Sequence, residues 1–120
     1  MNPTANKRKG AQWEIDLLNY FRSLNYQVER LRLSGKQDEG DLALERAGMG
    51  DVLVIEAKNV AKLDLAGWVK QAQLEAKNYD KRRQIPSASS TGVVVHKRKQ
   101  HGVDDAYVTL SLKDFLWLVM

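Results

Sequence analysis

The sequence lacks cysteine, has only two prolines and contains no long apolar run. Without cysteine the 120-residue chain can form neither disulfide bonds nor a thiolate metal site, which fits a reducing compartment. Residues 1–6 are polar and lack the apolar centre of a signal peptide, and no segment approaches the roughly 20 apolar residues that span a membrane. We therefore expect a soluble protein of the cytoplasm with no membrane partner.

The composition indicates one folded domain. Hydrophobic residues make up 43% of the chain and charged residues 28%, as in ordinary globular proteins rather than disordered ones. We expect a single domain over residues 1–120, of which residues 1–7 are flexible. A chain of this size buries a modest core, so a homodimer is an expected source of further stability.

The basic residues gather in clusters. The formal net charge is +4, which is compatible with a polyanionic partner, although many proteins without such a partner share it. Clusters occupy residues 7–9, 30–36, 77–83 and 97–99. For any one cluster taken alone, solvated charge on an exposed end or loop is as good an explanation as contact with a polyanion.

Apolar spacing and turn residues predict an α/β order of elements. Helical periodicity marks residues 10–24, and a longer helix opens at Asp64 as its cap and ends before Pro86. Strands are predicted at residues 26–33, 41–45, 51–58, 92–96 and 106–110, so the order is helix, three strands, helix, two strands, helix. Ser111 and Asp114 resemble a capping box that opens a last helix over residues 112–120. The expected buried faces of the first two helices are Trp13, Leu17, Leu18, Phe21 and Leu24, and Leu65, Trp68, Val69, Ala72, Ala76 and Tyr79.

Glu56 and Lys58 stand two residues apart at the end of the apolar segment 51–58. Side chains of a strand alternate between its faces, so these two project to one side while Ile55 and Ala57 point to the other. Charged residues are rarely buried without partners. A structural ion pair where the strand meets solvent explains the two charges as well as a catalytic site does.

Two further carboxylates favour a metal site. Asp41 opens the neighbouring predicted strand directly after a glycine, from where its carboxylate reaches the same end of the sheet as Glu56. Mg²⁺ takes one or two carboxylates, with water and substrate phosphate as its other ligands. Lys58 would then orient or deprotonate the attacking water, or stabilise charge on the phosphate. Glu14 falls within the apolar arc of the first helix, although an acid in a first turn also complements the helix dipole.

The order of these residues resembles the PD-(D/E)xK nuclease superfamily over nearly the whole chain. The likeness comprises a helical Glu14, Gly40-Asp41 at a strand start, Glu56-Ala57-Lys58 after an apolar strand, and Gln71 and Gln73 on the following helix. Within the superfamily the sequence is most similar to the small Holliday junction resolvases of archaea and bacteriophages. Gly40 stands where the superfamily label has proline, at a position that varies in the superfamily.

This resemblance implies a restriction-endonuclease-like α/β fold, with a central mixed sheet flanked by helices. It also implies a dimeric, Mg²⁺-dependent endodeoxyribonuclease, with Mn²⁺ as a substitute metal, that acts in DNA recombination and repair. Such an enzyme resolves four-way junctions by paired symmetric cuts that leave 5′-phosphate and 3′-hydroxyl ends. A bacteriophage source would place it in the cytoplasm of the host.

The resemblance also assigns roles to the residues that match it. Metal binding falls to Asp41, Glu56 and the backbone carbonyl of Ala57, and Lys58 is the catalytic lysine. Glu14 would act through a second metal or a bound water.

Gln71 is the fifth expected catalytic residue, because it borders the buried face of its helix while Gln73 points further outward. An ordinary amide on the helix surface is the alternative. We expect His96 and His101 to be surface or turn residues rather than catalytic bases. The tryptophans are expected to pack in the core or in a dimer rather than to stack on bases: Trp13, Trp68 and Trp117.

The basic clusters predict contacts with DNA phosphates. Lysine and arginine bind phosphates with release of counterions, which gives affinity without base readout and suits an enzyme that recognises branched shape. The expected DNA-binding residues are Lys7, Arg8 and Lys9 before the first helix, Arg30, Arg32 and Lys36 near the loop 34–40, and Lys97, Arg98 and Lys99 in the last hairpin. The loop 34–40 precedes Asp41 and is expected to move when DNA binds.

Two alternatives fit the same residues. Another endonuclease of the superfamily would act on ordinary duplex or flap DNA, and a DNA-binding module would keep the fold without cleavage. The presence of Asp41, Glu56 and Lys58 together favours an enzyme over the second alternative.

Overall fold

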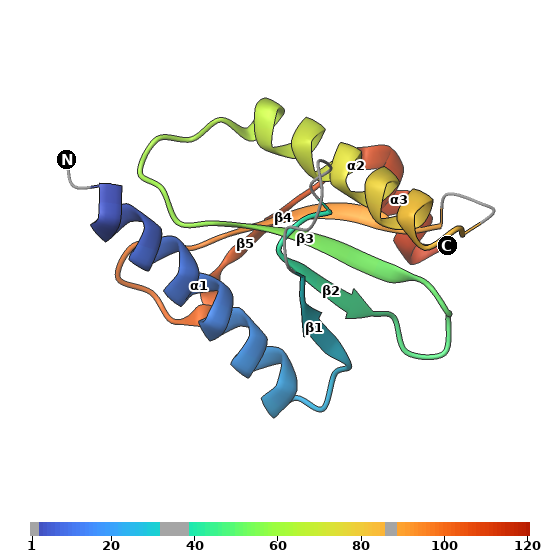
Figure 1. Ribbon diagram of the computed structural model, residues 1–120, viewed down its shortest axis with the longest axis horizontal. Coiled ribbons are helices and arrows are strands. Elements are labelled where there is room, and N and C mark those ends of the chain that lie inside the picture. Colours follow the sequence, from blue (N-terminus) through green and yellow to red (C-terminus); the bar gives the residue numbers. More distant parts are fainter. Residues whose placement is uncertain (1–2, 32–38, 86–88) are drawn as a thin grey trace.

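A five-stranded mixed sheet forms the centre of the protein, with long helices on its two faces (Figure 1). The computed structural model describes residues 3–31, 39–85 and 89–120. Its elements are α1 (Pro3–Ser23), β1 (Val28–Arg30), β2 (Leu42–Glu45), β3 (Val52–Lys58), α2 (Leu65–Arg82), β4 (Thr91–His96), the 3₁₀ turn η1 (Val103–Asp105), β5 (Tyr107–Thr109) and α3 (Leu112–Val119). The predicted α/β class and the predicted order of helices and strands are confirmed. Within the described residues, no helix combines the length and the apolar composition that a membrane span needs.

The strands lie in the order β1-β2-β3-β4-β5, so each strand neighbours the next along the chain. β1, β2 and β3 pair antiparallel, β3 and β4 pair parallel, and β5 returns antiparallel along β4. A parallel pair requires a crossover connection, which α2 supplies. As a result β3 is central, and Lys58 at its C-terminal end lies opposite His96 at the end of β4.

Alternation along β3 separates two apolar layers. Ile55 belongs to a buried cluster with Trp13 and Leu17 of α1, whereas Val54 packs with Ala76 and Tyr79 of α2. Odd-numbered residues of β3 therefore face α1 and even-numbered residues face α2. The charged end of the strand consequently lies beneath α2.

α1 begins earlier than the sequence analysis predicted. The expected start was residue 10, but the helix begins at Pro3. Proline suits the first turn of a helix, because that position needs no backbone donor. Residues 5–9 are exposed, so no buried stripe marks these turns in the sequence. The basic cluster Lys7, Arg8 and Lys9 therefore lies on the surface of α1 and not before it.

α2 begins as predicted. The side chain of Asp64 accepts a hydrogen bond from the backbone N–H of Gly67 at 3.2 Å, which caps the helix. Most of the expected apolar face is buried or half-buried, but Leu65 is 41% exposed. Two acidic residues that the apolar stripe did not predict, Glu75 and Asp80, are buried on the same helix.

α3 is capped as predicted, but most of its apolar residues are exposed. The Oγ atom of Ser111 accepts a hydrogen bond from the backbone N–H of Asp114 at 3.1 Å. Arg46, in the turn between β2 and β3, donates to the carbonyl of Leu118 at 3.0 Å and holds the end of the helix. Trp117 is 58% exposed, so of its two expected roles it does not pack in the core of the chain, and packing in a dimer stays a prediction. None of the helix's own residues is buried, and α3 thus presents an apolar surface.

Candidate functional site

Glu56 and Lys58 meet at the C-terminal end of β3. The Nζ atom of Lys58 lies 3.4 Å from Oε1 of Glu56, and the exposed fractions of the two side chains are 21% and 9%. The ion pair that the sequence suggested therefore exists. Because two charges lose solvation when they are buried, such a pair is weak evidence for a purely stabilising role. What surrounds the pair decides its function.

Asp41 is held against the same end of β3 by two hydrogen bonds. Its backbone N–H donates to the carbonyl of Ile55 at 2.9 Å, and its Oδ2 accepts from the backbone N–H of Ala57 at 2.8 Å. Ala57 separates Glu56 from Lys58 along the strand. The structure thus brings the Asp41 carboxylate to the end of β3 that carries the two other charges.

Gly40 adopts a backbone angle that proline cannot. Its φ is +96°, whereas the proline ring holds φ at about −65°. A Cβ at this position would also lie 2.7 Å from Cγ1 of Val54. This backbone conformation therefore suits glycine and excludes proline at residue 40. The glycine lets the chain approach β3 closely at the residue before Asp41.

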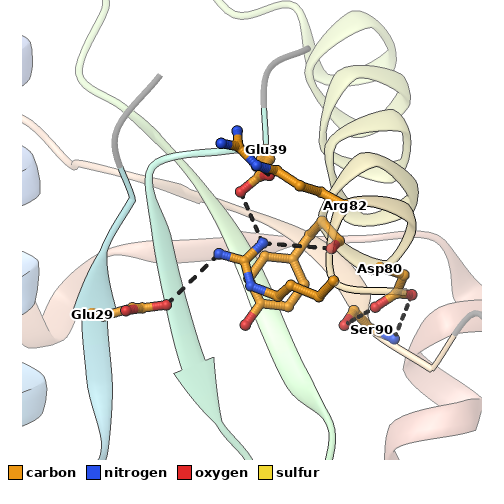
Figure 2. Close-up of polar contacts among 7 residues, drawn as sticks. Glu29, Glu39, Asp80, Arg82 and Ser90 are labelled. Carbon is orange, nitrogen blue, oxygen red and sulfur yellow. Dashed lines mark hydrogen bonds and ion pairs between the residues drawn. The ribbon is translucent and has the colours of Figure 1, made fainter. Parts of the chain in front are cut away.

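An ionic cluster fixes the chain just ahead of this glycine. Glu39 is 5% exposed, and its carboxylate lies 2.9 Å from Nη1 of Arg83 and 3.3 Å from Nε of Arg82 (Figure 2). The Arg83 guanidinium also lies over the ring of Tyr79, 3.7 Å from its centroid, and 3.9 Å from Glu29. Burial raises the pKa of the Tyr79 hydroxyl, and the charge of Arg83 opposes that shift. The cluster ties the segment that enters β2 to the C-terminal end of α2.

α2 adds an amide and a buried acid above the charged pair. The Nζ atom of Lys58 donates to Oε1 of Gln71 at 3.4 Å, and Nε2 of Gln71 donates to Oε2 of Glu75 at 3.3 Å. Gln71 therefore reaches the site, whereas Gln73 lines a separate cavity of about 480 Å³ between α2 and α3. The apolar stripe of α2 did not predict a role for Glu75, because a carboxylate interrupts such a stripe. The available signal was its position on the buried face, one turn after Gln71.

Glu14 belongs to the other side of the sheet. It lies on α1, and its Oε1 is 3.3 Å from Nε of Arg30 on β1. Glu14 thus lies on the helix that covers one face of the sheet, whereas Glu56 points to the other face, beneath α2. Its action through a second metal or a bound water stays a prediction. Arg30, an expected DNA contact, is engaged by Glu14, with 40% of its side chain exposed.

The oxygen donors at the end of β3 suit a hard divalent cation. Asp41 and Glu56 both supply carboxylates there, and Mg²⁺ is bound by one or two carboxylates together with water and substrate phosphate. Among residues 3–31, 39–85 and 89–120, no group of three histidine, cysteine or acidic side chains is placed to hold a metal. A cation at this end would therefore take its other ligands from backbone, water or substrate, which is the usual way that Mg²⁺ binds.

His96 is buried, contrary to the expectation of a surface or turn residue. It is 9% exposed, and its Nε2 lies 2.8 Å from Oγ1 of Thr109. Its ring lies between those of Trp68 and Tyr107, at centroid distances of 5.7 Å and 5.8 Å. Burial lowers the pKa of His96. The ring centroid of Trp68 also lies 6.0 Å from Nζ of Lys58, so this aromatic group borders the lysine of the charged pair.

Two basic clusters lie at this end of the sheet. Figure 1 shows the start of α1 and the turn after β4 at the end where β3 terminates. The Nζ atom of Lys97 lies 5.8 Å from the ring centroid of Trp13 on α1, and the guanidinium of Arg98 lies 4.5 Å from that of Tyr107. Lys97 and Lys99 are exposed. Two expected DNA contacts, Arg32 and Lys36, lie outside the described residues. So do residues 34–38 of the loop that was expected to move.

Comparison with known proteins gives a likeness in fold. The sequence matches no protein-family model and no curated protein. Among solved structures, the 1.6 Å structure of Hjc from Archaeoglobus fulgidus, a Holliday junction resolvase from an archaeal hyperthermophile, is similar with a TM-score of 0.51. The likeness covers 90% of this chain and 93% of that one at 15% sequence identity. At this identity the comparison concerns architecture, and it shows that the chain has the α/β fold of that resolvase.

Proposed function

We propose that this protein is a Mg²⁺-dependent endodeoxyribonuclease that cuts four-way DNA junctions. The observation that carries the proposal is the hydrogen bond from the backbone N–H of Ala57 to Asp41. This bond sets one carboxylate at the end of a central strand that already holds Glu56 and Lys58 as a pair. The fold supports the choice of substrate, because a solved structure with a similar fold is that of a Holliday junction resolvase.

Asp41, Glu56 and the backbone carbonyl of Ala57 would hold the metal ion. When bound, Mg²⁺ polarises the scissile phosphate and favours deprotonation of an attacking water, and Mn²⁺ shares its preference for oxygen ligands. The protein's own contribution is to fix the two carboxylates. Asp41 is fixed by its bonds to β3, and Glu56 by its contact with Lys58.

Lys58 would stabilise the negative charge that develops on the phosphate. An ammonium group has three N–H donors, and in the free protein Lys58 directs donors at Glu56 and Gln71. A further donor serves a phosphate oxygen, where a fixed positive charge is most effective in a site shielded from water. In the reaction a water oxygen bonds to phosphorus while the bond to the 3′ oxygen breaks. The water releases a proton and the 3′ oxygen gains one, which leaves 5′-phosphate and 3′-hydroxyl ends.

Paired symmetric cuts require two sites, so the proposal includes a homodimer. The exposed apolar residues of α3 support a second copy as the partner of this helix: Leu112 at 71%, Phe115 at 48%, Leu116 at 45%, Trp117 at 58% and Val119 at 61%. Large exposed apolar surfaces are uncommon on proteins that remain monomeric.

Light scattering after gel filtration tests the dimer. The wild type is expected at twice the mass of the chain, and Trp117→Lys is expected to move toward the monomer. Leu24→Lys is the matched control, because Leu24, in the turn directly after α1, is a comparably exposed apolar residue at 49%. A wild type that stays monomeric while it makes paired cuts would contradict this part of the proposal.

A substrate panel tests the activity. Purified protein is incubated with a four-way junction, a matched duplex and a flap, each with Mg²⁺ or with chelator. We expect symmetric nicks on the junction alone, and only with the metal. Cutting of duplex or flap would favour another endonuclease of the superfamily. Absence of cleavage with both Mg²⁺ and Mn²⁺ would contradict the enzyme and favour a DNA-binding module of the same fold.

A further inference from the structure

Glu75 is an acid in a place that favours an apolar side chain. It lies on the sheet-facing side of α2, next to the buried Ala76, and is itself 1% exposed. A buried carboxylate loses its hydration, and an apolar residue of similar volume often serves the stability of a protein as well or better. This cost of burial suggests that Glu75 serves a role other than stability, and its surroundings indicate which one.

One contact of Glu75 leads to Lys58. Oε2 of Glu75 accepts a hydrogen bond from Nε2 of Gln71 at 3.3 Å, and Oε1 of Gln71 accepts from Nζ of Lys58 at 3.4 Å. A glutamine amide has a donor end and an acceptor end, whereas a carboxylate only accepts. Because Glu75 takes the donor end of Gln71, the acceptor end is directed at Lys58.

The other oxygen of Glu75 lies near Gly40, the residue before Asp41. Oε1 of Glu75 lies 3.7 Å from the point where a Cβ at Gly40 would stand. Gly40 directly precedes Asp41, so Glu75 borders both the segment that carries the first carboxylate and the amide that holds the lysine.

We propose that Glu75 is a positioning residue that acts through Gln71 to hold Lys58 beside Glu56. This inference rests on the proposed nuclease function, in which Lys58 meets the phosphate. Loss of Glu75 would leave the Gln71 amide able to turn its NH₂ end toward the ammonium, which repels a donor. Lys58 would then sample positions away from the reacting phosphate.

The central variant is Glu75→Met, which replaces the acid by an apolar side chain of similar length. We expect cleavage of the junction to have a kcat lower by about 10- to 100-fold, as for other residues that orient a catalytic group. The melting temperature is expected to be unchanged or higher, and the Kd for the junction in chelator unchanged. A merely structural role predicts the reverse, a lower melting temperature with the rate preserved.

Asp80→Ala is the matched control on the same helix. Asp80 is 4% exposed, and it accepts hydrogen bonds from the backbone N–H and the Oγ of Ser90, at 3.1 Å and 2.6 Å. These bonds hold the chain that leads into β4, so this variant should melt at a lower temperature while its kcat stays at the wild-type level.

Variants at Gln71 test the route of the effect. Residues that act as one unit are not additive, so Gln71→Leu combined with Glu75→Met should be no slower than Gln71→Leu alone. Glu75→Gln keeps a carbonyl acceptor and should retain most of the wild-type rate. Gln73→Leu, a change to the amide that lines the separate cavity, should leave the rate unchanged.

A readout without catalysis separates this inference from the proposed function. In ¹⁵N spectra, the side-chain NH₂ of Gln71 should exchange slowly with solvent in the wild type and faster in Glu75→Met. Equal exchange in the two proteins, or a Glu75→Met variant that cuts as fast as a cutting wild type, would overturn the inference alone. A wild type that cuts no DNA would contradict the proposed function, and the catalytic role of Glu75 with it.

Discussion

A single backbone angle at residue 40 governs how Asp41 approaches β3. Alanine at this position would add a Cβ that meets Val54 and would place an L-residue at a φ of +96°. We expect Gly40→Ala to lower the free energy of unfolding by about 1–3 kcal/mol. We also expect slower DNA cleavage, because Asp41 would move from its bond with Ala57. Equilibrium unfolding in urea and single-turnover cleavage measure the two effects.

Gly48→Ala is the matched control for this prediction. Gly48 has a φ of +75°, but nothing lies within 4 Å of an added Cβ. The free energy of unfolding that Gly48→Ala loses reports the effect of the backbone angle alone. Gly40→Ala should therefore lose more, and only Gly40→Ala should slow cleavage. Equal costs and equal rates in the two variants would show that the close approach to Val54 does not matter.

The burial of the His96 ring predicts that the protein loses stability at low pH. Burial lowers the pKa of His96 below its ordinary value of 6.5, so the folded state favours the neutral ring. The neutral His96 ring therefore contributes its full stabilisation at a pH above the pKa that His96 has in the unfolded protein. This stabilisation is lost as the pH falls through the lower pKa that His96 has in the folded protein. We expect acid to destabilise the wild type more than His96→Gln. Urea midpoints at about pH 8 and about pH 5 measure the difference. The same loss in both proteins would contradict it.

At the scale of the elements, α2 and β4 touch through Gly92. A Cβ there would lie 2.1 Å from the carbonyl oxygen of Ala72, which is backbone and cannot rotate away. Gly92→Ala must therefore push α2 off the sheet, and the turn that moves also carries Gln71. We expect a loss of about 1–3 kcal/mol or more in the free energy of unfolding, together with slower cleavage.

Urea unfolding tests this prediction, with alanine at a glycine whose added Cβ would contact nothing as the control. Gly10, on α1, has nothing within 4 Å of an added Cβ, and alanine in a helix is preferred to glycine by up to about 1 kcal/mol. Gly10→Ala should thus unfold at the same or a higher urea concentration than the wild type. A Gly92→Ala variant as stable as the wild type would mean that α2 does not pack so closely on β4.

The order of the elements could be predicted because each element carries a local signal. The apolar run of β3 indicated a central strand, and Asp64 and Ser111 marked helix starts that the structure confirms. The start of α1 could not be predicted in the same way. Residues 5–9 near its start are all exposed, and a helical segment without a buried stripe shows no apolar periodicity.

The candidate site was predictable only in part, because sequence order does not encode contacts across the fold. The alternation of β3 paired Glu56 with Lys58, and the turn before β2 suggested Asp41. No local pattern could show that Glu39 meets two arginines at the end of α2, or that Glu14 lies on the helix opposite the face toward which Glu56 points. Those facts depend on how α1 and α2 pack on the sheet.

At the scale of the whole molecule, the end of the sheet with the carboxylates also carries exposed basic residues from α1 and from the turn after β4 (Figure 1). If junction phosphates bind there, removal of one contacting lysine should reduce the slope of log K against log salt by about 0.9. We expect this for Lys7→Ala and Lys99→Ala. Fluorescence anisotropy of a labelled junction in chelator, over a range of salt, measures the slope.

Lys113→Ala is the matched control, since it removes the same charge from α3, beside the cavity between α2 and α3. Its slope should equal that of the wild type. A slope that falls as much for Lys113→Ala as for Lys99→Ala would show that DNA does not follow the end of the sheet that holds the carboxylates.

The most direct test of the central claim compares the wild type with Glu56→Gln on the same four-way junction. The substitution keeps the size of the side chain and removes the charge that would hold Mg²⁺ beside Asp41. We predict that the wild type cuts the junction with Mg²⁺ and that Glu56→Gln does not, while the two bind the junction with similar affinity. Undiminished cutting by Glu56→Gln would contradict the assignment of the active site to the end of β3.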